Sequence, residues 1–240
     1  GICPPRPQIW FGNLRAKQVT MIMRYTKILA IAVVMLLLGV LAAGAQVPTL
    51  RYAAPKGCEQ LILVEATEGC NSVVTLLDMK DGMWSFVATL RGTVGYNGTT
   101  TAKREGDGCT PEGVYELRCG MYYECDFESA FPMVQYHEHD MWIEDPKSEL
   151  YNTFLPDAGA DIEGDRLWQR RETQYRYIVV VEYNTDPIVR GAGSAIFIHS
   201  WRAPGKPTAG CIGLAEGDVK RVVEWLQPAC NPHIMIQRAN

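Results

Sequence analysis

Short apolar runs separated by turn residues constrain the fold of this chain more than any other feature. Each run has roughly four to seven residues, and most lie between Gly, Pro, Asn or Asp, which is typical of β-strands. A helix is predicted over residues 215–227, where apolar residues recur at helical spacing until Pro228. We therefore expect one mainly β domain, a β-sandwich or mixed sheet, with one C-terminal helix. The predicted strands are Leu61–Glu65, Ser72–Leu77, Trp84–Leu90, Val114–Leu117, Tyr177–Tyr183, Ala195–His199 and His233–Gln237.

The region from residue 123 to residue 176 is polar and aromatic and carries few strand signals. Irregular segments of this length inside a compact domain are usually functional, so we expect a long loop region beside a functional site. The composition is that of a folded chain, because 47% of the residues are hydrophobic and 21% are charged. A net charge of −4 argues against a protein that binds nucleic acid through a basic surface.

Residues 23–45 have the three parts of a secretory signal peptide. Two basic residues, Arg24 and Lys27, precede the apolar run 28–41, and small residues end the pattern at 43–45. The apolar run is short for a transmembrane span, which needs about 20 residues. The pattern therefore favours a cleaved signal over an uncleaved membrane anchor.

Residues 1–22 precede this signal, and we interpret them as a start-site or cloning artefact. The excluded residues 1–45 hold five basic residues and no acidic one, so the remaining domain, 46–240, is more acidic than the whole chain. The net negative charge of this domain therefore does not attract it to nucleic acid or to an anionic membrane. We expect an exported monomer that needs no metal or cofactor and is not stably inserted in the membrane after cleavage.

Seven cysteines follow the predicted signal, and export permits disulfides. Because seven is odd, at most three bridges form, and one thiol is left over as a candidate reactive group. No CxxC pair occurs, so the spacing does not fit a zinc site. The closures that are shortest in sequence join Cys58 to Cys70 and Cys119 to Cys125, but the sequence does not choose among the pairings. The other three cysteines are Cys109, Cys211 and Cys230.

His199 and Cys211 form the constellation that most suggests chemistry. A predicted strand ends at His199, a loop with two prolines and a glycine follows, and Gly210-Cys211 opens the next apolar segment. This order can bring the imidazole beside the thiol, where the imidazole accepts the proton of the nucleophile. Gly210 leaves room for backbone N–H groups to approach a carbonyl oxygen, as an oxyanion hole requires. The alternative is that Cys211 is half of a disulfide and His199 is a structural histidine.

These residues resemble the active-site signature of the YkuD-type L,D-transpeptidases, which is a histidine, a spacer and then Ser/Thr-x-Gly-Cys-Ile/Val. The matching residues here are His199 and Thr208-Ala-Gly-Cys211-Ile. Three further segments resemble the family in the same order along the chain. The resemblance therefore covers essentially the whole domain and implies a YkuD-like fold with a long active-site loop region. The further segments are Arg104–Tyr115, Trp142–Asn152 and Gly193–His199.

The resemblance implies an enzyme of the bacterial cell envelope, periplasmic or extracellular, that acts on peptidoglycan stem peptides. The family's cysteine attacks the carbonyl of the third residue of a tetrapeptide stem and releases the terminal D-Ala. An amine of another stem then resolves the acyl-enzyme and forms a cross-link between the two third residues. Water in place of the amine makes the same chemistry an L,D-carboxypeptidase.

The resemblance also implies a role for each matching residue. Cys211 corresponds to the nucleophile, and His199 to the general base that later protonates the leaving amine. Ser200 follows the histidine, where the family uses a backbone carbonyl to orient the imidazole. Gly210 and Cys211 correspond to the backbone donors of the oxyanion hole. Thr208 corresponds to the Ser/Thr position, which places the loop or a substrate group.

One position departs from the common pattern, because many family members have an arginine where this chain has Gly213. Such an arginine can anchor a carboxylate, and Arg202 in the neighbouring loop is a candidate substitute or else a solvated arginine. The family branch that the Trp142 segment resembles commonly lacks this arginine. Trp142, Tyr151 and Asn152 are candidates for lining the substrate cleft, with the alternative that they hold the long loop against the core.

Two alternatives to a transpeptidase stay open at this point. The first keeps the cysteine and histidine chemistry but has water as acceptor, giving a carboxypeptidase or another peptidoglycan peptide hydrolase. The second is a secreted, disulfide-rich binding module with an inactive site. This second alternative requires Cys211 to be bridged, most simply to Cys230, and another cysteine to be free.

Overall fold

The computed structural model describes residues 48–123, 128–159 and 162–239. The predicted signal peptide at 23–45 and the interpretation of residues 1–22 lie outside these ranges. Within them, no helix has the length and the apolar character that a membrane span requires.

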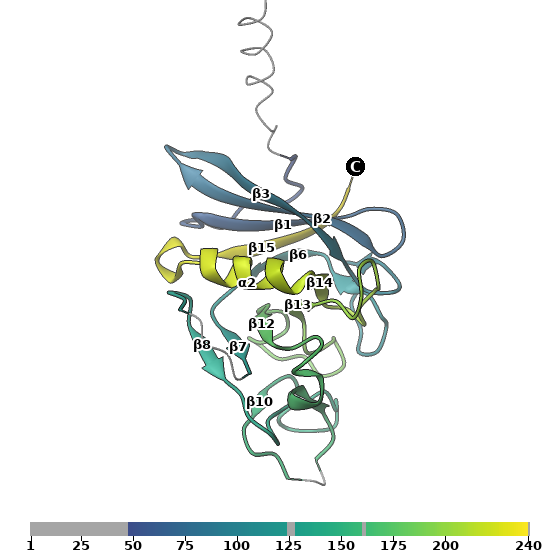
Figure 1. The fold of residues 1–240 in the computed structure, drawn as a ribbon. Helices are drawn as coiled ribbons and strands as arrows, with labels where there is room; N and C mark the ends of the chain where they lie inside the picture. Colours follow the sequence, from purple (N-terminus) through teal and green to yellow (C-terminus); the bar gives the residue numbers. More distant parts are fainter. Residues whose placement is uncertain (1–47, 124–127, 160–161, 240) are drawn as a thin grey trace, which may run out of the picture. The chain divides into compact units, whose positions relative to one another are not determined.

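Ten strands form one large mixed sheet, as the mainly β prediction requires (Figure 1). Neighbouring strands are antiparallel except for three parallel pairs, β15 with β1, β14 with β13 and β7 with β8. All seven predicted strands are present in this sheet, with ends that differ by a few residues. In order across the sheet, the strands are β6 (Gly113–Glu116), β15 (His233–Arg238), β1 (Gln60–Ala66), β2 (Asn71–Lys80), β3 (Met83–Thr93), β14 (Ile212–Leu214), β13 (Phe197–Ser200), β12 (Tyr177–Val180), β7 (Gly120–Tyr122) and β8 (Met133–Gln135).

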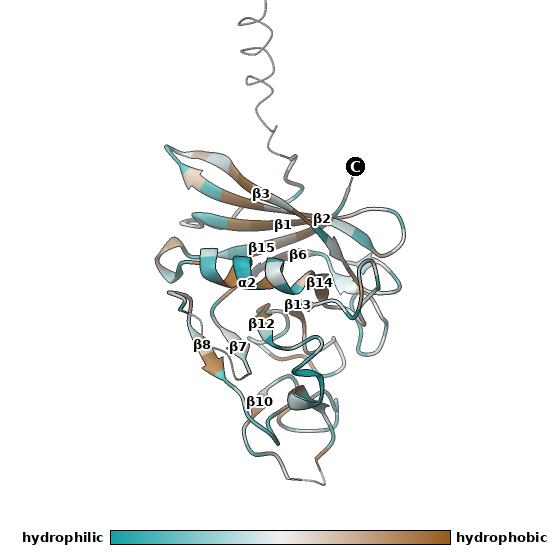
Figure 2. Cartoon of the chain, in the orientation of Figure 1, coloured by the Kyte–Doolittle hydropathy of each residue, from teal (hydrophilic) through white to brown (hydrophobic). Residues whose placement is uncertain are grey.

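The predicted helix is α2 (Glu216–Trp225), and it lies between the two halves of this sheet (Figure 1). Its buried valines share one core with residues of β1 and β2 on one side and of β12 and β13 on the other. Hydrophilic residues on the exposed side of α2 are visible in Figure 2. Burying each of these valines contributes about 1.5–3 kcal/mol, so the helix fixes both halves of the sheet. The buried residues of α2 are Val219, Val222 and Val223.

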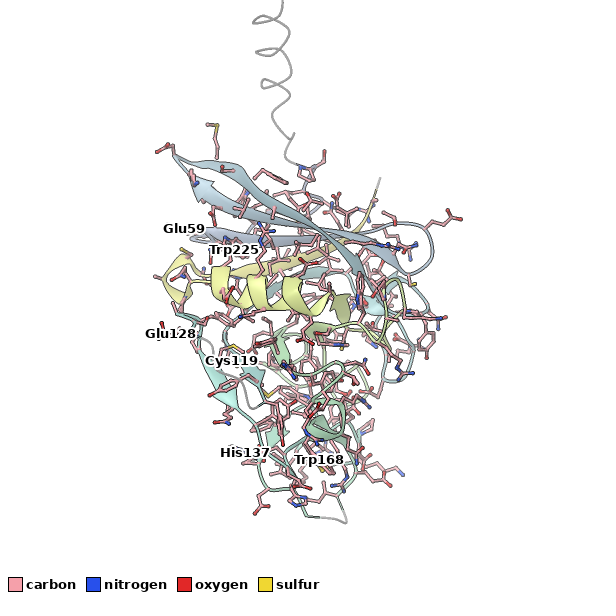
Figure 3. All side chains as sticks on the ribbon, viewed as in Figure 1. Glu59, Cys119, Glu128, His137, Trp168 and Trp225 are labelled. Carbon is pink, nitrogen blue, oxygen red and sulfur yellow. The ribbon has the colours of Figure 1, made fainter. Side chains whose placement is uncertain are left out.

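The C-terminal end of α2 is tied to the start of β1. The amide of Gln60 donates a hydrogen bond to the carbonyl of Trp225 over 3.0 Å, and the Trp225 indole donates to Asp78 over 3.1 Å. Figure 3 shows Trp225 near Glu59, the residue that precedes β1. A short 3₁₀ helix, η2 (Pro228–Cys230), then leads the chain into β15.

The region expected to be irregular contains a small sheet of three two-residue strands. Their order is β10 (Phe154–Leu155), β9 (Met141–Trp142) and β11 (Asp165–Arg166), and the 3₁₀ helix η1 (Leu167–Arg170) follows. Strands this short are too brief to show an alternating pattern. Trp142 packs edge-on against Phe197 of β13, with the ring centroids 5.0 Å apart, so this region forms a wall beside β13. A second small sheet pairs β4 (Thr99–Thr100) with β5 (Thr110–Pro111).

The six cysteines among the described residues are all free thiols, so the short closure between Cys58 and Cys70, one of the pairings that the sequence left open, is not present. Cys58 precedes the seven-residue strand β1, and Cys70 follows it, directly before β2. A strand of that length spans roughly 20 Å, whereas the Cα atoms of a disulfide lie about 4–7 Å apart. Cys119 is a free thiol as well, so its pairing with Cys125, which lies outside the described residues, is not found either.

Candidate active site

Strand pairing brings His199 and Cys211 to one face of the large sheet. In the parallel pair of β13 and β14, Ile198 lies opposite Ile212 and His199 lies opposite Gly213. Because alternate residues of a strand share a face, His199 and Cys211 lie on the face opposite to that of the two isoleucines. The isoleucines are buried in the main core.

Both side chains line a cavity of about 760 Å³, which we call the active-site cavity. Its walls come from the loop that follows β13, from the region of the small sheet, and from the segment before β5. Of the residues predicted to act on substrate, Thr208, Gly210 and Arg202 also line the cavity, whereas Trp142, Tyr151 and Asn152 do not.

A backbone carbonyl holds the imidazole of His199 in one orientation. The Nδ1 atom of His199 lies 2.8 Å from the carbonyl oxygen of Ser200. Since a carbonyl only accepts hydrogen bonds, Nδ1 carries the proton and donates it, which leaves Nε2 as an acceptor. The Tyr175 ring packs against the imidazole in a T-shaped arrangement, with ring centroids 5.0 Å apart. Burial lowers the pKa of His199 to about 4, so the imidazole is neutral at pH 7.

Cys211 is a buried thiol in the resting structure. Only 8% of the residue is exposed, and Sγ donates a hydrogen bond to the carbonyl of Ala195 over 3.1 Å. Burial raises the pKa of Cys211 to about 12, and the nearby carboxyl groups of Asp165 and Glu144 also raise it. The thiol and the imidazole are therefore both neutral at rest.

Thr208 shapes the loop that leads into Cys211. Its hydroxyl donates a hydrogen bond to the carbonyl of Cys211 over 2.6 Å and accepts one from the N–H of Gly210 over 3.2 Å. Gly210 has a φ of +150°, and a Cβ there would lie 3.0 Å from the carbonyl oxygen of Cys109. Glycine is therefore required at this turn. A substrate oxyanion that binds the Gly210 N–H must replace the hydroxyl of Thr208 as its partner.

Gly213, which stands where many family members carry arginine, has no room for a side chain. A Cβ at this position would lie 2.6 Å from Oγ1 of Thr93, 3.2 Å from Cγ2 of Thr208 and 3.3 Å from Cβ of Trp201. These neighbours occupy the space that an arginine side chain would need. An arginine at this position is therefore incompatible with the packing of this chain.

Gly213→Ala is accordingly expected to destabilise the fold by about 1–3 kcal/mol through overcrowding. The matched control is Gly217→Ala in α2, where nothing lies within 4 Å of the added Cβ. This control is expected to stabilise the fold by up to about 1 kcal/mol, because alanine favours helix. Urea unfolding of both variants measures the difference. Equal stability of the two variants would show that the space at Gly213 is open.

Asn152 holds the segment that precedes β13. Its amide nitrogen donates to the carbonyls of Tyr183 and Asn184, over 3.1 and 2.8 Å. Its amide oxygen accepts from the indole of Trp142 over 2.9 Å and from the N–H of Ala195 over 3.0 Å. All four hydrogen-bonding positions of this amide are thus used inside the protein. These contacts fit the alternative in which the long loop region is held against the core.

Tyr151 makes similar contacts one residue earlier. Its hydroxyl donates to the carboxylate of Glu105 and accepts a hydrogen bond from the N–H of Gly193 over 3.1 Å. The residue is 1% exposed. Tyr151 therefore supports the segment that contains Ala195, whose carbonyl accepts the hydrogen bond of the Cys211 thiol.

Asn152→Ala is expected to destabilise the protein by about 2–5 kcal/mol, because it leaves several buried backbone groups and an indole N–H without partners. Thermal or urea unfolding measures this loss. Asn184→Ala is a control in the same loop cluster, since Asn184 is only partly buried and its side chain bonds within the loop to Val189 and Gly193. A loss at Asn152 no larger than that at Asn184 would contradict the anchoring role.

Sequence reasoning missed a polar network in the cavity wall. The guanidinium of Arg170 donates to Asp165 over 2.7 Å and to the hydroxyl of Tyr175 over 2.9 Å. The Tyr175 hydroxyl in turn donates to Asp165 over 2.8 Å. This network fixes the Tyr175 ring against His199. No motif signals it in the sequence, because its members lie on β11, on η1 and in the loop before β12.

A comparison with protein families agrees with this geometry. The family model of the YkuD L,D-transpeptidase catalytic domain matches residues 73–235. The matched range runs from β2 into β15 and includes both His199 and Cys211. The chain therefore belongs to the YkuD family of L,D-transpeptidase catalytic domains, which act on peptidoglycan. A search of curated proteins finds no match to this chain.

Proposed function

We propose that this protein is a cysteine-dependent L,D-transpeptidase that joins peptidoglycan stem peptides through an acyl-enzyme on Cys211. One observation carries the proposal: Cys211 and His199 share one face of a parallel strand pair in the same cavity. A second detail agrees with it, because the Ser200 carbonyl leaves Nε2 of His199 ready to accept a proton. Family membership supplies the substrate class.

The first half-reaction follows from these positions. Nε2 of His199 takes the proton of the Cys211 thiol as Sγ attacks the carbonyl carbon of the third stem residue. The N–H groups of Gly210 and Cys211 stabilise the oxyanion that forms. His199 then gives the same proton to the nitrogen of the leaving D-Ala, and the C–N bond breaks. The product is a thioester between the stem peptide and Cys211.

Two cations of the cavity are suited to hold the carboxylate of the leaving D-Ala. Arg202 and Lys206 lie on the loop that follows β13, and both line the cavity. Both are exposed, and neither forms an ion pair with another residue in the described part of the chain. They can take over the anchoring role that an arginine at Gly213 would have had.

The remaining expectations complete the proposal. A single catalytic domain, exported as a monomer by the signal at 23–45, works on the stem peptides of the cell envelope. The carboxypeptidase alternative uses the same groups, with water as acceptor. The inactive binding module is disfavoured, because its bridge between Cys211 and Cys230 is absent and both residues are free thiols.

Incubation of the purified protein with a disaccharide-tetrapeptide tests the proposal. Release of D-Ala together with a cross-linked dimer is the expected result. Release of D-Ala without dimer would assign the protein as a carboxypeptidase, and absence of both products would contradict the enzymatic proposal.

A further inference from the structure

Glu144 is a carboxyl group of the active-site cavity that the chemistry of Cys211 and His199 does not use. It follows β9 and lines the same cavity as these two residues. Among the residues that the structure describes, none donates a hydrogen bond to its carboxyl group or forms an ion pair with it. It is partly buried, so water compensates for a missing partner only in part.

The two other carboxylates of the cavity already have partners. Glu105 accepts a hydrogen bond from the Ser194 hydroxyl over 2.7 Å and another from Tyr151. Asp165 forms a 2.7 Å ion pair with Arg170. In the described part of the cavity wall, Glu144 is thus the carboxyl group left to receive a ligand.

The surroundings of Glu144 favour the arrival of a cation. Burial, together with the negative charges of Asp165 and Glu105, raises the pKa of Glu144 to about 7. A positive ligand group would offset both the lost hydration and the repulsion between the carboxylates. Of the cations that line the described cavity wall on the side of Glu144, Arg170 is already paired with Asp165. Glu144 therefore has no ion-pair partner among the described residues.

The proposed reaction brings one cation into this cavity. The acceptor stem carries an amine on a side chain, and such an amine has a pKa of about 10.4, so it arrives as an ammonium group. An ammonium ion has no lone pair with which to attack a thioester. The acceptor must therefore lose a proton close to Cys211.

We propose that Glu144 binds the ammonium group of the acceptor stem and takes its proton, and so directs the acyl-enzyme to an amine in preference to water. The inference rests on the proposed function and deepens it. The Glu144 carboxylate receives one proton from the ammonium group, which gives a carboxylic acid and a neutral amine. The amine nitrogen attacks the thioester carbonyl, and the C–S bond breaks. A second proton passes from this nitrogen through His199 to Sγ, and Glu144 releases its proton to solvent.

The raised proton affinity of Glu144 suits this role. Transfer from an ammonium group to an ordinary carboxylate is strongly uphill, because their proton affinities differ widely. A carboxyl group with a pKa of about 7 narrows that difference. Glu144 remains ionised in a large fraction of molecules at neutral pH and can still attract the cation.

Glu144→Gln tests the proposal with two nucleophiles of different charge. The donor is a disaccharide-tetrapeptide, and the acceptors are Nα-acetyl-lysine amide, a cation, and hydroxylamine, which is uncharged at neutral pH. We expect the rate of amide formation with the lysine derivative to fall by about 10–100-fold, as for a lost charge-assisted hydrogen bond. The rate with hydroxylamine should change by less than about threefold on the same scale.

Two further variants complete the design. Glu144→Asp keeps the charge and is expected to restore part of the reaction with the lysine derivative. Glu149→Gln removes an exposed carboxylate of the same segment and is expected to behave as wild type. Intact mass measures the acyl-enzyme of each variant separately from its resolution by the acceptor.

The outcomes separate this inference from the proposed function. An unchanged rate with the lysine derivative in Glu144→Gln would overturn the role of Glu144. An equal loss with both nucleophiles, or a loss of the acyl-enzyme itself, would assign Glu144 a structural role and also overturn it. If wild type forms no acyl-enzyme, the proposed function fails, and this inference fails with it.

Discussion

Cys211→Ala is expected to abolish the release of D-Ala and the formation of any acyl-enzyme. The thiol is the nucleophile of the proposed mechanism, and no other cysteine lines the described cavity wall. Alanine retains the Cβ and fits the space left by the thiol, so the fold is expected to persist. Mass spectrometry of the protein and of the released products measures both effects.

Cys109→Ala is the matched control for this variant. Cys109 lies beside the loop of Gly210, but its thiol contacts the carbonyls of Asn97 and Asp107 and does not line the cavity. Its loss is expected to leave the reaction intact. Residual turnover in Cys211→Ala, or an equal loss in Cys109→Ala, would contradict the assignment of the nucleophile.

His199→Gln is expected to lower the rate of acylation by about 10²–10⁴-fold, the usual contribution of a general base. His233→Gln is a close control, because His233 is also a buried strand histidine whose Nδ1 lies 2.8 Å from a backbone carbonyl, that of Asn231. His233 does not line the active-site cavity. Substrate-dependent D-Ala release measures both rates. Similar losses in the two variants would indicate a structural effect of replacing a buried histidine.

The pH profile of acylation gives an independent readout of His199. Burial lowers the pKa of His199 from 6.5 to about 4, so the imidazole keeps its basic form well below neutral pH. The rate of acylation should therefore hold as the pH falls through 6.5 and should decline only as it approaches 4. The stability linked to this residue has the same sign: it is fully present above 6.5 and is lost progressively toward 4. A decline centred near 6.5 would contradict the burial of the imidazole.

The large sheet and the helix were predictable because their apolar patterns record burial directly. The apolar residues around Ile62 do not alternate with polar ones, as is expected of a strand with both faces buried. They form β1, in the centre of one half of the sheet. The valines of residues 215–227 recur at helical spacing because only one face of α2 is buried. Packing of this kind can be predicted from the spacing of apolar residues within one segment.

The site was predictable only where a motif has a fixed local geometry. His199 and Thr208–Cys211 lie on one strand–loop–strand unit, so their spacing determines how they meet. Glu144 and Asp165 come from different elements of a region without periodicity. Both reach the cavity through strands of two residues, which are too short to show a periodic apolar pattern in the sequence. The same limit applies to the closure of Cys58 with Cys70, because their short separation in sequence contains a whole extended strand.

The site roles of Trp142, Tyr151 and Asn152 illustrate a related limit. Aromatic and amide residues in a long loop are equally suited to touch a substrate or to anchor the loop. The hydrogen bonds of Asn152 to Ala195 and to Trp142 favour anchoring, and no residue pattern expresses such a network.

The most direct test of the central claim is the mass of the protein during turnover. Wild-type protein is mixed with a disaccharide-tetrapeptide, quenched in acid and analysed intact and after proteolysis. The account predicts a covalent adduct with the mass of the donor less D-Ala, on the peptide that contains Cys211. Absence of an adduct while D-Ala is released, or an adduct on another residue, would contradict an acyl-enzyme at Cys211.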